Sequence, residues 1–293
     1  MAGRKPLGGA LRRKVSELLT PASIQSLLAQ HGLRPSRALG QNFLCDPNTA
    51  RRIVRLAGVE PGEHVVEVGP GLGSLTLALC EAGARVTAVE LDQYLKPVLE
   101  TVTRGCAVDV VAGDALAIDW SALLTEPPYS MVANLPYNIA TPMLMRAVEI
   151  APMIDRYLVM VQREVGERLA APPGSRVYGA VSVRLAYWCE AKVVGIVPPT
   201  VFIPRPNVES ALVQVIRRPS PAVDVPDRQR LFALIHAGFA TRRKSLRQSL
   251  RSVLGGRTDA VLSEANIAPL TRAEALSIDE FAVLARADAT VAS

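Results

Sequence analysis

The sequence predicts an α/β fold in which a doubly wound, mostly parallel sheet precedes a smaller all-helical C-terminal domain. Three observations lead to this prediction. Between residues 64 and 218, short runs rich in β-branched residues alternate with helical segments, which is the order typical of a parallel sheet. A glycine-rich turn, EVGPGLGSLT at 67–76, joins the first of these strands to the next helix. Beyond the Pro-rich segment RRPSPAVDVP at 217–226, the apolar periodicity is helical only.

Capping residues and β-branched runs mark the elements in chain order. Thr20 as N-cap and Pro21 in the first turn predict a helix over 22–31, and a further helix is expected from Asp46-Pro47. The expected strands are 64–69, 84–91, 108–116, 129–135, 157–162, 191–197 and 210–218. The expected helices of the same region are 74–83, 92–105, 141–150 and 163–170, with Pro97 tolerable only in a first turn. Helical segments at 227–254 and 270–288 are expected to form the C-terminal domain.

The chain is expected to divide into a basic flexible tail at 1–20, the α/β domain at 21–218 and a helical, RNA-binding domain at 219–293. Its 49% hydrophobic and 20% charged residues are typical of a folded protein. No apolar run approaches the ~18 residues of a spanning helix, and we expect neither a membrane span nor a signal peptide. The four cysteines and three histidines are scattered without a CxxC pair, so we expect a reducing, cytoplasmic location and no metal site.

The net charge of +6 is unevenly distributed along the chain. Residues 1–14 hold five basic and no acidic side chains, and residues 217–257 hold ten basic side chains against Asp224 and Asp227. These two segments together carry +13, so the rest of the chain sums to −7. Such segregation favours a polyanionic partner, although charge alone leaves a solvated surface equally open.

The glycine-rich turn has an unusual spacing. Its glycines are Gly69, Gly71 and Gly73, whereas the dinucleotide fingerprint is G-x-G-x-x-G. Glu67 precedes them at the end of the strand, and a carboxylate beside a helix N-terminus is unfavourable for a pyrophosphate. The same arrangement suits a ligand with both an ammonium and a carboxylate, such as the amino-acid end of S-adenosylmethionine. A tight strand-to-helix turn without a ligand is the alternative.

Two acids follow the next strands. Glu90 ends the second strand, where an acid can accept hydrogen bonds from ribose hydroxyls, or can simply be a solvated strand end. Asp114, after the third strand, can accept from an adenine amine or cap a helix. Because the carboxyl ends of parallel strands meet at one edge of the sheet, we expect these residues to share a binding site.

The fourth strand ends in NLPY at 134–137. The side-chain oxygen of Asn134 and the carbonyl of Leu135 are two acceptors, Pro136 stiffens the turn that aims them, and Tyr137 offers a ring on which a base can stack. Two acceptors on one exocyclic amine favour a pyramidal nitrogen whose lone pair can attack a methyl group. The chemistry predicted here is positioning and electrostatics, without a general base.

Taken together, the motifs of the chain resemble those of a known family, the small-subunit ribosomal RNA adenine dimethyltransferases of the KsgA type. The matching motifs are GQNFL (40–44), EVGPGLGSLT (67–76), VTAVELD (86–92), GDAL (113–116), NLPYNIATP (134–142), MVQREVGERL (160–169), YGAVSV (178–183), FIPRPNVESALV (202–213) and FATRRKSL (239–246). The resemblance implies a Rossmann-like S-adenosylmethionine-dependent methyltransferase domain with a helical C-terminal domain. It also implies transfer of methyl groups to N6 of two adjacent adenines near the 3′ end of 16S rRNA.

The resemblance also implies roles for individual residues. The residues implied for the cofactor are Gln41, Asn42 and Leu44 at its methionine end, Gly69 through its backbone, Glu90 at the ribose, Asp114 at the adenine amine, and Asn134 between cofactor and target. Tyr137 and Phe202 would sandwich a flipped adenine, since a stacked base cannot present its amine to the methyl group. Without the resemblance, Phe202 reads as a core aromatic.

The segment TRRKSLRQSLR at 241–251 is the expected RNA-binding ridge. Arg243, Arg247 and Arg251 are spaced i, i+4, i+8, which would place them on one helix face together with Arg242 and Lys244. The expected partner is 16S rRNA in the assembling small subunit, with the protein as a monomer. A solvated helix face is the alternative.

Other functions fit parts of the pattern. One is an RNA-binding ribosome-assembly factor without activity, and another is a large-subunit rRNA adenine methyltransferase of the macrolide-resistance type. A nicotinamide-dependent oxidoreductase is disfavoured by the glycine spacing. A DNA adenine methyltransferase is disfavoured by the C-terminal motifs.

Overall fold

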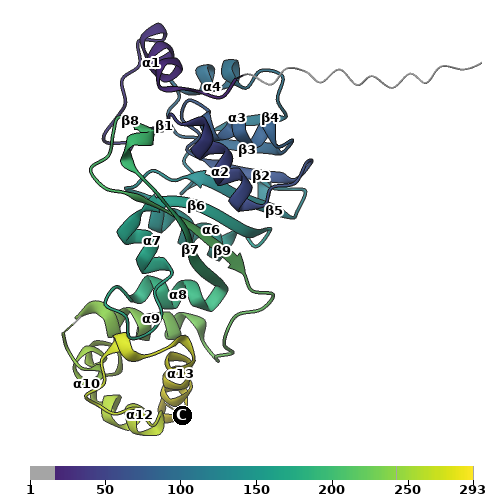
Figure 1. The fold of residues 1–293 in the computed structure, drawn as a ribbon. Helices are drawn as coiled ribbons and strands as arrows, with labels where there is room; N and C mark the ends of the chain where they lie inside the picture. Colours follow the sequence, from purple (N-terminus) through teal and green to yellow (C-terminus); the bar gives the residue numbers. More distant parts are fainter. Residues whose placement is uncertain (1–16, 242, 293) are drawn as a thin grey trace, which may run out of the picture.

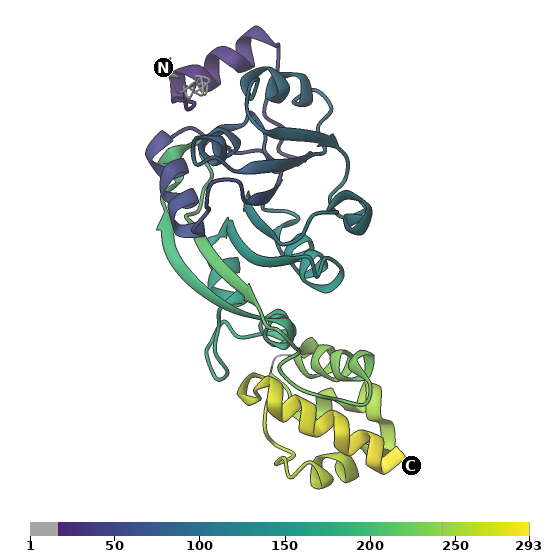
Figure 2. The ribbon, with the colours of Figure 1, turned by 90° about the vertical axis from the view of Figure 1, so that its right-hand side faces the viewer.

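The computed structural model describes residues 17–241 and 243–292. A sheet flanked by helices forms one part of the molecule, and a cluster of helices built from the C-terminal residues forms the other (Figure 1). A view turned by 90° also separates the two parts, so the molecule is elongated (Figure 2). The predicted basic tail of residues 1–20 lies outside the described residues except for 17–20, where Leu19 is buried.

The main sheet has seven strands in the order β4-β3-β2-β5-β6-β9-β7. The strands β4, β3, β2, β5 and β6 pair parallel with one another, and β9 pairs antiparallel with both β6 and β7. The strands are β2 (His64–Val68), β3 (Arg85–Glu90), β4 (Val108–Ala112), β5 (Tyr129–Asn134), β6 (Ile154–Gln162), β7 (Cys189–Val197) and β9 (Ser210–Arg217). The predicted α/β fold with a mostly parallel sheet is therefore confirmed.

A separate two-stranded ladder joins distant parts of the chain. β1 (Phe43–Leu44) pairs antiparallel with β8 (Phe202–Ile203), so Leu44 lies opposite Phe202. The sequence motifs around these strands did not predict the pairing, because two residues are too few to show an apolar alternation.

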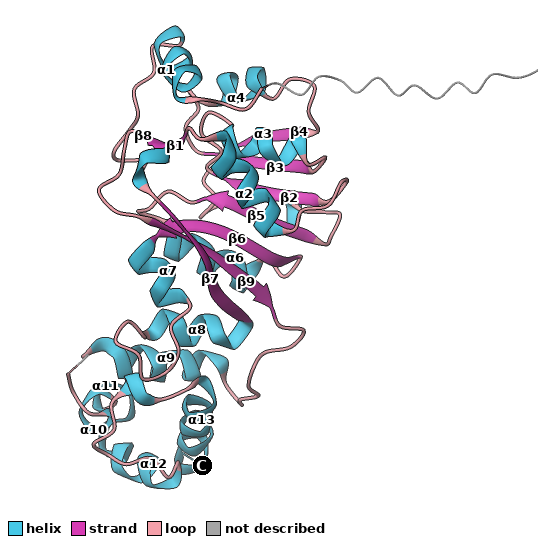
Figure 3. Cartoon of the chain, viewed as in Figure 1, coloured by secondary structure: helices cyan, strands magenta, loops and turns pink. Residues whose placement is uncertain are grey.

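Helices cover the sheet and fill the C-terminal part (Figure 3). The helices are α1 (Pro21–Gln30), α2 (Pro47–Ala57), α3 (Ser74–Glu81), α4 (Lys96–Val102), α5 (Trp120–Leu123), α6 (Ala140–Ile150), α7 (Arg163–Leu169), α8 (Ala180–Trp188), α9 (Arg228–Ala240), α10 (Leu246–Ser249), α11 (Arg251–Leu254), α12 (Thr258–Glu264) and α13 (Ile278–Ala292). The predicted caps are present, because Thr20 accepts from the Ser23 amide at 3.3 Å and Asp46 from the Thr49 amide at 2.9 Å.

One predicted helix is wrong. The apolar periodicity of 227–254 predicts a continuous helix, but α9 ends at Ala240 and α10 begins only at Leu246. The side chain of Leu246 is fully buried, and its amide donates to the carbonyl of Thr271 at 2.7 Å. Ser245, at the N-cap, has the extended ψ of 161° that brings the chain to this contact. Packing against the segment before η3 (Ala273–Ala275) thus overrides the local helical pattern.

Helix α8 contributes to two hydrophobic cores. Leu185 packs in the core between the sheet and helices α6 and α7, together with residues of β5, β6 and β9. Val183 and Tyr187 instead pack in the C-terminal core with residues of α9, α12 and α13, and Tyr178 just before the helix joins them. The C-terminal core therefore includes residues that precede the Pro-rich segment in the sequence.

Candidate cofactor and substrate pocket

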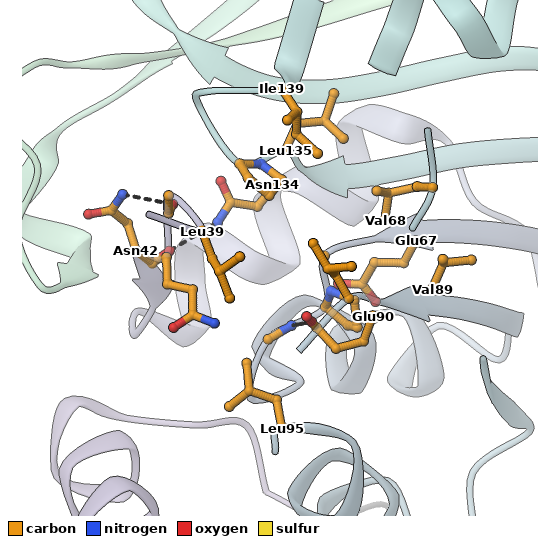
Figure 4. Close-up of a pocket in the computed structure, with 18 of the residues that line it drawn as sticks. Leu39, Asn42, Glu67, Val68, Val89, Glu90, Leu95, Asn134, Leu135 and Ile139 are labelled. Atoms are coloured by element: carbon orange, nitrogen blue, oxygen red, sulfur yellow. Dashed lines mark hydrogen bonds between the residues drawn. The ribbon is translucent and has the colours of Figure 1, made fainter. Parts of the chain in front are cut away.

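The carboxyl ends of β2, β3, β4 and β5 open into one pocket of about 960 Å³, including its part open to solvent. Figure 4 shows Glu90 of β3 and Asn134 of β5 on different sides of this space, with Leu39 projecting between them. The predicted residues that line it are Gln41, Asn42, Leu44, Glu67, Gly69, Gly71, Glu90, Asp114, Asn134, Leu135 and Tyr137. A crossover-connected parallel sheet binds ligands at this edge.

The glycine turn brings its backbone close to the pocket. Gly69 and Gly71 have φ values of +68° and +60°, which L side chains rarely adopt. A Cβ on Gly71 would lie 2.9 Å from Cδ1 of Phe43, so the space beside this backbone is closed to a side chain. Gly73, with φ +94°, is the N-cap of α3 and does not line the pocket. Gly73 therefore shapes the turn, while Gly69 and Gly71 face the ligand space.

Glu90 is held by the backbone on both oxygens. The Gly71 amide donates to its Oε2 at 3.0 Å, and the Asp92 amide donates to its Oε1 at 2.9 Å. The residue is 6% exposed, and burial raises the pKa of this carboxyl while these amides lower it. The carboxyl is thus fixed in the pocket wall with lone pairs left for hydroxyl donors.

Glu67 is a buried carboxyl at the end of β2. It is 1% exposed and accepts one hydrogen bond from the Thr76 hydroxyl at 2.6 Å. Burial raises the pKa of Glu67 to about 8, and the nearby charge of Glu90 adds to the shift. A cation in the pocket would favour the ionised form, so the site suits an ammonium.

Asp114 is exposed at the rim after β4. Its Oδ1 accepts from the Leu116 amide at 2.8 Å, so one oxygen holds its own turn. The sequence left open a helix cap, and the residue instead begins a turn in which the Ala117 amide donates to its carbonyl at 2.8 Å. The second carboxylate oxygen is available to an amine donor at the pocket edge.

Asn134 has a defined amide orientation. Its Nδ2 donates to the backbone carbonyl of Asn42 at 3.2 Å, which leaves Oδ1 as an acceptor toward the pocket. The next residue, Leu135, is 1% exposed, and its amide donates to the Met160 carbonyl at 3.1 Å. Pro136 packs against Gly69, where a Cβ would lie 3.2 Å from the proline ring. The turn after β5 is thereby held against the glycine turn.

Tyr137 lies in the same pocket wall. Its hydroxyl is 2.7 Å from the hydroxyl of Ser210, the first residue of β9, which is fully buried. Burial raises the pKa of the Tyr137 phenol, so the ring remains neutral at physiological pH. The hydrogen bond fixes the ring from its far end and leaves its faces for stacking.

Phe202 is not brought into the pocket lining. It is 3% exposed and packs in the core with Leu44, Val197 and Leu212. Phe202 is therefore a core aromatic in this structure, as the residue types alone indicated. Its stacking role stays a prediction that rests on the family resemblance.

Several lining residues were not predicted from the sequence: Leu39, Leu91, Leu95, Asn138 and Ile139. Leu91 follows Glu90 directly and is 54% exposed, and an apolar residue at a solvated strand end was the signal that could have identified it. Asn138 and Ile139 directly follow Tyr137 in the motif NLPYNIATP, whereas Leu39 and Leu95 come from segments that reach the pocket only through the tertiary fold.

The pocket fits S-adenosylmethionine by the chemistry of its donors and acceptors. Two buried carboxyls, Glu67 and Glu90, offer acceptors to an ammonium and to ribose hydroxyls. Leucine side chains, including Leu72 and Leu75, supply an apolar wall for a ring and a thioether-like chain. At Gly71 the place of a side chain is taken by the Phe43 ring, which packs against the backbone of the glycine turn.

The predicted basic ridge is not a single helix face. Arg243 lies in the turn between α9 and α10, whereas Arg247 and Arg251 lie on α10 and α11. Arg247 is already paired with Asp259 at 2.7 Å. Lys244 and Arg251 are exposed, and Arg242 lies outside the described residues. The break between α9 and α10 removes the i, i+4, i+8 alignment on which the ridge was predicted.

Within residues 17–241 and 243–292, no group of three or more histidine, cysteine or acidic side chains is placed to hold a metal ion. Within the same residues, no helix combines the length and the hydropathy needed to cross a membrane.

Comparisons with known proteins agree with the pocket. The model of the family "Ribosomal RNA adenine dimethylase" matches residues 33–288. "Ribosomal RNA small subunit methyltransferase A" of Streptomyces griseus is 46% identical over 282 residues, covering 94% of this chain and 97% of that protein. The protein of the same name from Leifsonia xyli is 49% identical over 276 residues, covering 92% and 98%.

Two solved structures share the fold over most of the chain. A dimethyladenosine transferase from Plasmodium falciparum has a TM-score of 0.70 at 22% identity, covering 83% of this chain and 95% of that one. The 23S rRNA methyltransferase ErmE has a TM-score of 0.65 at 26% identity, covering 84% and 99%.

Proposed function

The chain belongs to the ribosomal RNA adenine dimethylase family, and we propose that it dimethylates N6 of two adjacent adenines near the 3′ end of 16S rRNA. The family match and the curated relatives make it an S-adenosylmethionine-dependent rRNA adenine dimethyltransferase. The choice of the small subunit is supported by relatives at 46% and 49% identity that are named for small-subunit RNA. The observation that carries the proposed mechanism is the orientation of Asn134, whose oxygen is left facing the pocket.

The residues proposed to hold the cofactor come from three strand ends and from the segment 41–44, which ends in β1. Glu67 and the backbone of Gly69 would hold its amino-acid end, with Gln41, Asn42 and Leu44 across it. Glu90 would accept from the ribose, and Asp114 from the adenine amine. When bound, S-adenosylmethionine supplies a methyl group made electrophilic by the attached sulfonium.

Asn134 and Leu135 are proposed to position the target amine. The Oδ1 of Asn134 and the carbonyl of Leu135 would each accept one N6 hydrogen. This withdraws the nitrogen lone pair from the ring and aims it at the methyl group. The amine releases one proton to water for each methyl group that it gains, and the pocket must accept a methylated N6 for the second transfer. Tyr137, whose pKa is raised, cannot serve as the base at neutral pH.

The adenine is proposed to be flipped out of its RNA stack and placed on the ring of Tyr137. The hydrogen bond between Tyr137 and Ser210 supports this role, because a ring fixed at its hydroxyl presents a constant face. Phe202 would form the other side only if β8 shifts away from the core in which its ring is now buried.

The proposed partner is 16S rRNA within the assembling small subunit, bound by the protein as a monomer in the cytoplasm. Exposed Arg243, Lys244 and Arg251 support binding of phosphates by the C-terminal part.

The test is methyl transfer from labelled cofactor to small subunits that lack the adenine modification and, in parallel, to naked large-subunit rRNA. Nucleoside mass spectrometry would identify dimethyladenosine. Product in the small subunit alone supports the proposal. Product only in large-subunit RNA would move the activity to that of ErmE, and tight subunit binding without product would indicate an assembly factor.

A further inference from the structure

Residues 36–42 form a strap across the pocket, and four of them, Leu39 to Asn42, line it. The strap has its own internal bonds, because the Gln41 amide donates to the Ser36 carbonyl at 3.1 Å and the Leu39 amide to the Ser36 hydroxyl at 3.3 Å. The strap is therefore a folded loop, and its position over the pocket depends on the residues that hydrogen-bond to it on either side.

One side of the strap is held by the turn after β5. Nδ2 of Asn138 donates to the Ala38 carbonyl at 3.1 Å, and Nδ2 of Asn134 donates to the Asn42 carbonyl at 3.2 Å. Gly40 fits closely here, since a Cβ on it would lie 2.8 Å from Oδ1 of Asn138. The strap thus sets the orientation of the Asn134 amide.

The other side is held by Asp92, two residues after Glu90. Nε2 of Gln41 donates to Oδ2 of Asp92 at 2.8 Å, and Oε1 of Gln41 accepts from the Ser36 amide at 2.7 Å. The remaining oxygen of Asp92 accepts from the Tyr94 amide at 3.0 Å, and its own amide donates to Glu90 at 2.9 Å.

We propose that Asp92 is a positioning residue for methyl transfer. Through its hydrogen bond to Gln41, Asp92 holds the strap over the cofactor and thereby keeps the Asn134 amide in its orientation. Asp92 does not line the pocket, so it acts through its neighbours. The inference rests on the proposed function for the reaction that it serves. The bonds themselves join the end of β3, where the ribose is expected, to the end of β5, where the amine is expected.

The polarity of these bonds permits a reciprocal test. In D92N, the new NH2 group faces another donor in either orientation of the amide. In one orientation this donor is Nε2 of Gln41, and in the other it is the Tyr94 amide. In Q41E, a second carboxylate faces Asp92. In the double variant Q41E/D92N, the amide of residue 92 donates to the carboxylate of residue 41, and the Ser36 amide keeps its acceptor. The net charge of the double variant equals that of the natural protein.

The experiment measures the dissociation constant of S-adenosylmethionine by calorimetry, and turnover on unmodified small subunits, for the natural protein, both single variants and the double variant. We expect each single variant to weaken cofactor affinity about tenfold, near the lower end for loss of one hydrogen bond to a charged group. Turnover should fall as well, and the double variant should recover most of both losses. D109N on β4, an exposed position outside the pocket, is the matched control.

A second readout follows the strap directly. Arg37 is exposed within it, so trypsin cleavage between residues 37 and 38 reports its release. Cleavage should be faster in D92N and Q41E and slow again in the double variant. Single variants with natural affinity and cleavage, or a double variant no better than the singles, would overturn the proposal. Because calorimetry and cleavage need no RNA, both are independent of which RNA the protein methylates.

Discussion

The side-chain nitrogen of Asn134 lies 3.2 Å from the backbone carbonyl of Asn42, so a hydrogen bond joins the end of β5 to the strap that crosses the pocket. An amide has one donor end and one acceptor end, and this bond decides which end faces the ligand. The orientation that results leaves the side-chain oxygen toward the pocket, which is what the proposed role of Asn134 requires.

Replacing Asn134 should separate two contributions of its side chain, namely the hydrogen-bond acceptor that it offers and the orientation that the Asn42 carbonyl gives it. N134A removes the acceptor, and we expect turnover to fall about 100- to 1,000-fold, as for loss of one preorganised transition-state contact. N134D keeps an acceptor but sets an oxygen against the Asn42 carbonyl, so its loss should be smaller, about tenfold. Single-turnover methylation with saturating cofactor would measure both. Equal losses in the two variants would show that orientation by Asn42 contributes as much as the acceptor itself.

Tyr137 should contribute through its ring more than through its hydroxyl. Y137F loses the bond to Ser210, so the free energy of unfolding should fall by about 1 kcal/mol while turnover stays within a few-fold. S210A should behave similarly, because it removes the other partner of the same bond. Y137A removes the stacking face and should abolish methylation. Urea unfolding and turnover would be compared for the three variants, and an inactive Y137F would contradict a pure stacking role.

Glu67 should make cofactor binding depend on pH. Its pKa is about 8 in the folded protein and 4.5 in the unfolded chain, so between these values only the unfolded chain is ionised and stability falls as pH rises. An ammonium in the pocket favours the ionised form, so binding at pH 7 should release protons and tighten toward pH 8. Calorimetry in buffers of different ionisation enthalpy measures this release, which E67Q should abolish. A buffer-independent enthalpy in the natural protein would place the ammonium elsewhere.

Gly71 and Gly105 form a matched pair for the glycine turn. Both have positive φ, +60° and +89°, so alanine is strained at either, at a cost of about 1 kcal/mol. Only at Gly71 would the new Cβ meet a neighbour, Cδ1 of Phe43 at 2.9 Å. G71A should therefore lose more stability than G105A, and cofactor affinity as well. Thermal unfolding and calorimetry would compare them, and equal effects would argue that strain alone matters.

The C-terminal arginines should differ in their contribution to RNA binding. Arg251 has no ion-pair partner among the described residues, whereas Arg247 is paired with Asp259 at 2.7 Å. R251Q should reduce the slope of log affinity against log salt by about 0.7–0.9, the value for one phosphate contact. R247Q should change it less. Subunit binding titrated across salt concentrations would measure both slopes, and a larger effect of R247Q would mean that its ion pair opens on binding.

The strand ends were predictable because each carries its own signal. Glu90 and Asn134 follow apolar runs, and parallel strands must present their carboxyl ends together. Asp92 and Gln41 could not be paired from the sequence, because their hydrogen bond joins positions 51 residues apart. The break after Ala240 was missed for a related reason, since the buried contact of Leu246 with the segment at 271 is tertiary. Local periodicity does not contain either contact.

Helix α8 constrains how this protein can be recombined with its relatives. Its Leu185 belongs to the sheet core, whereas Val183 and Tyr187 belong to the C-terminal core. A chimaera joined in the Pro-rich segment at 217–226 would combine the α8 of one parent with the C-terminal helices of another, and mismatched side chains would meet in that core. The C-terminal helices would transplant with their core intact only if residues from about Tyr178 to Trp188 accompanied them. In this molecule, the unit of exchange is set by shared packing and not by the linker.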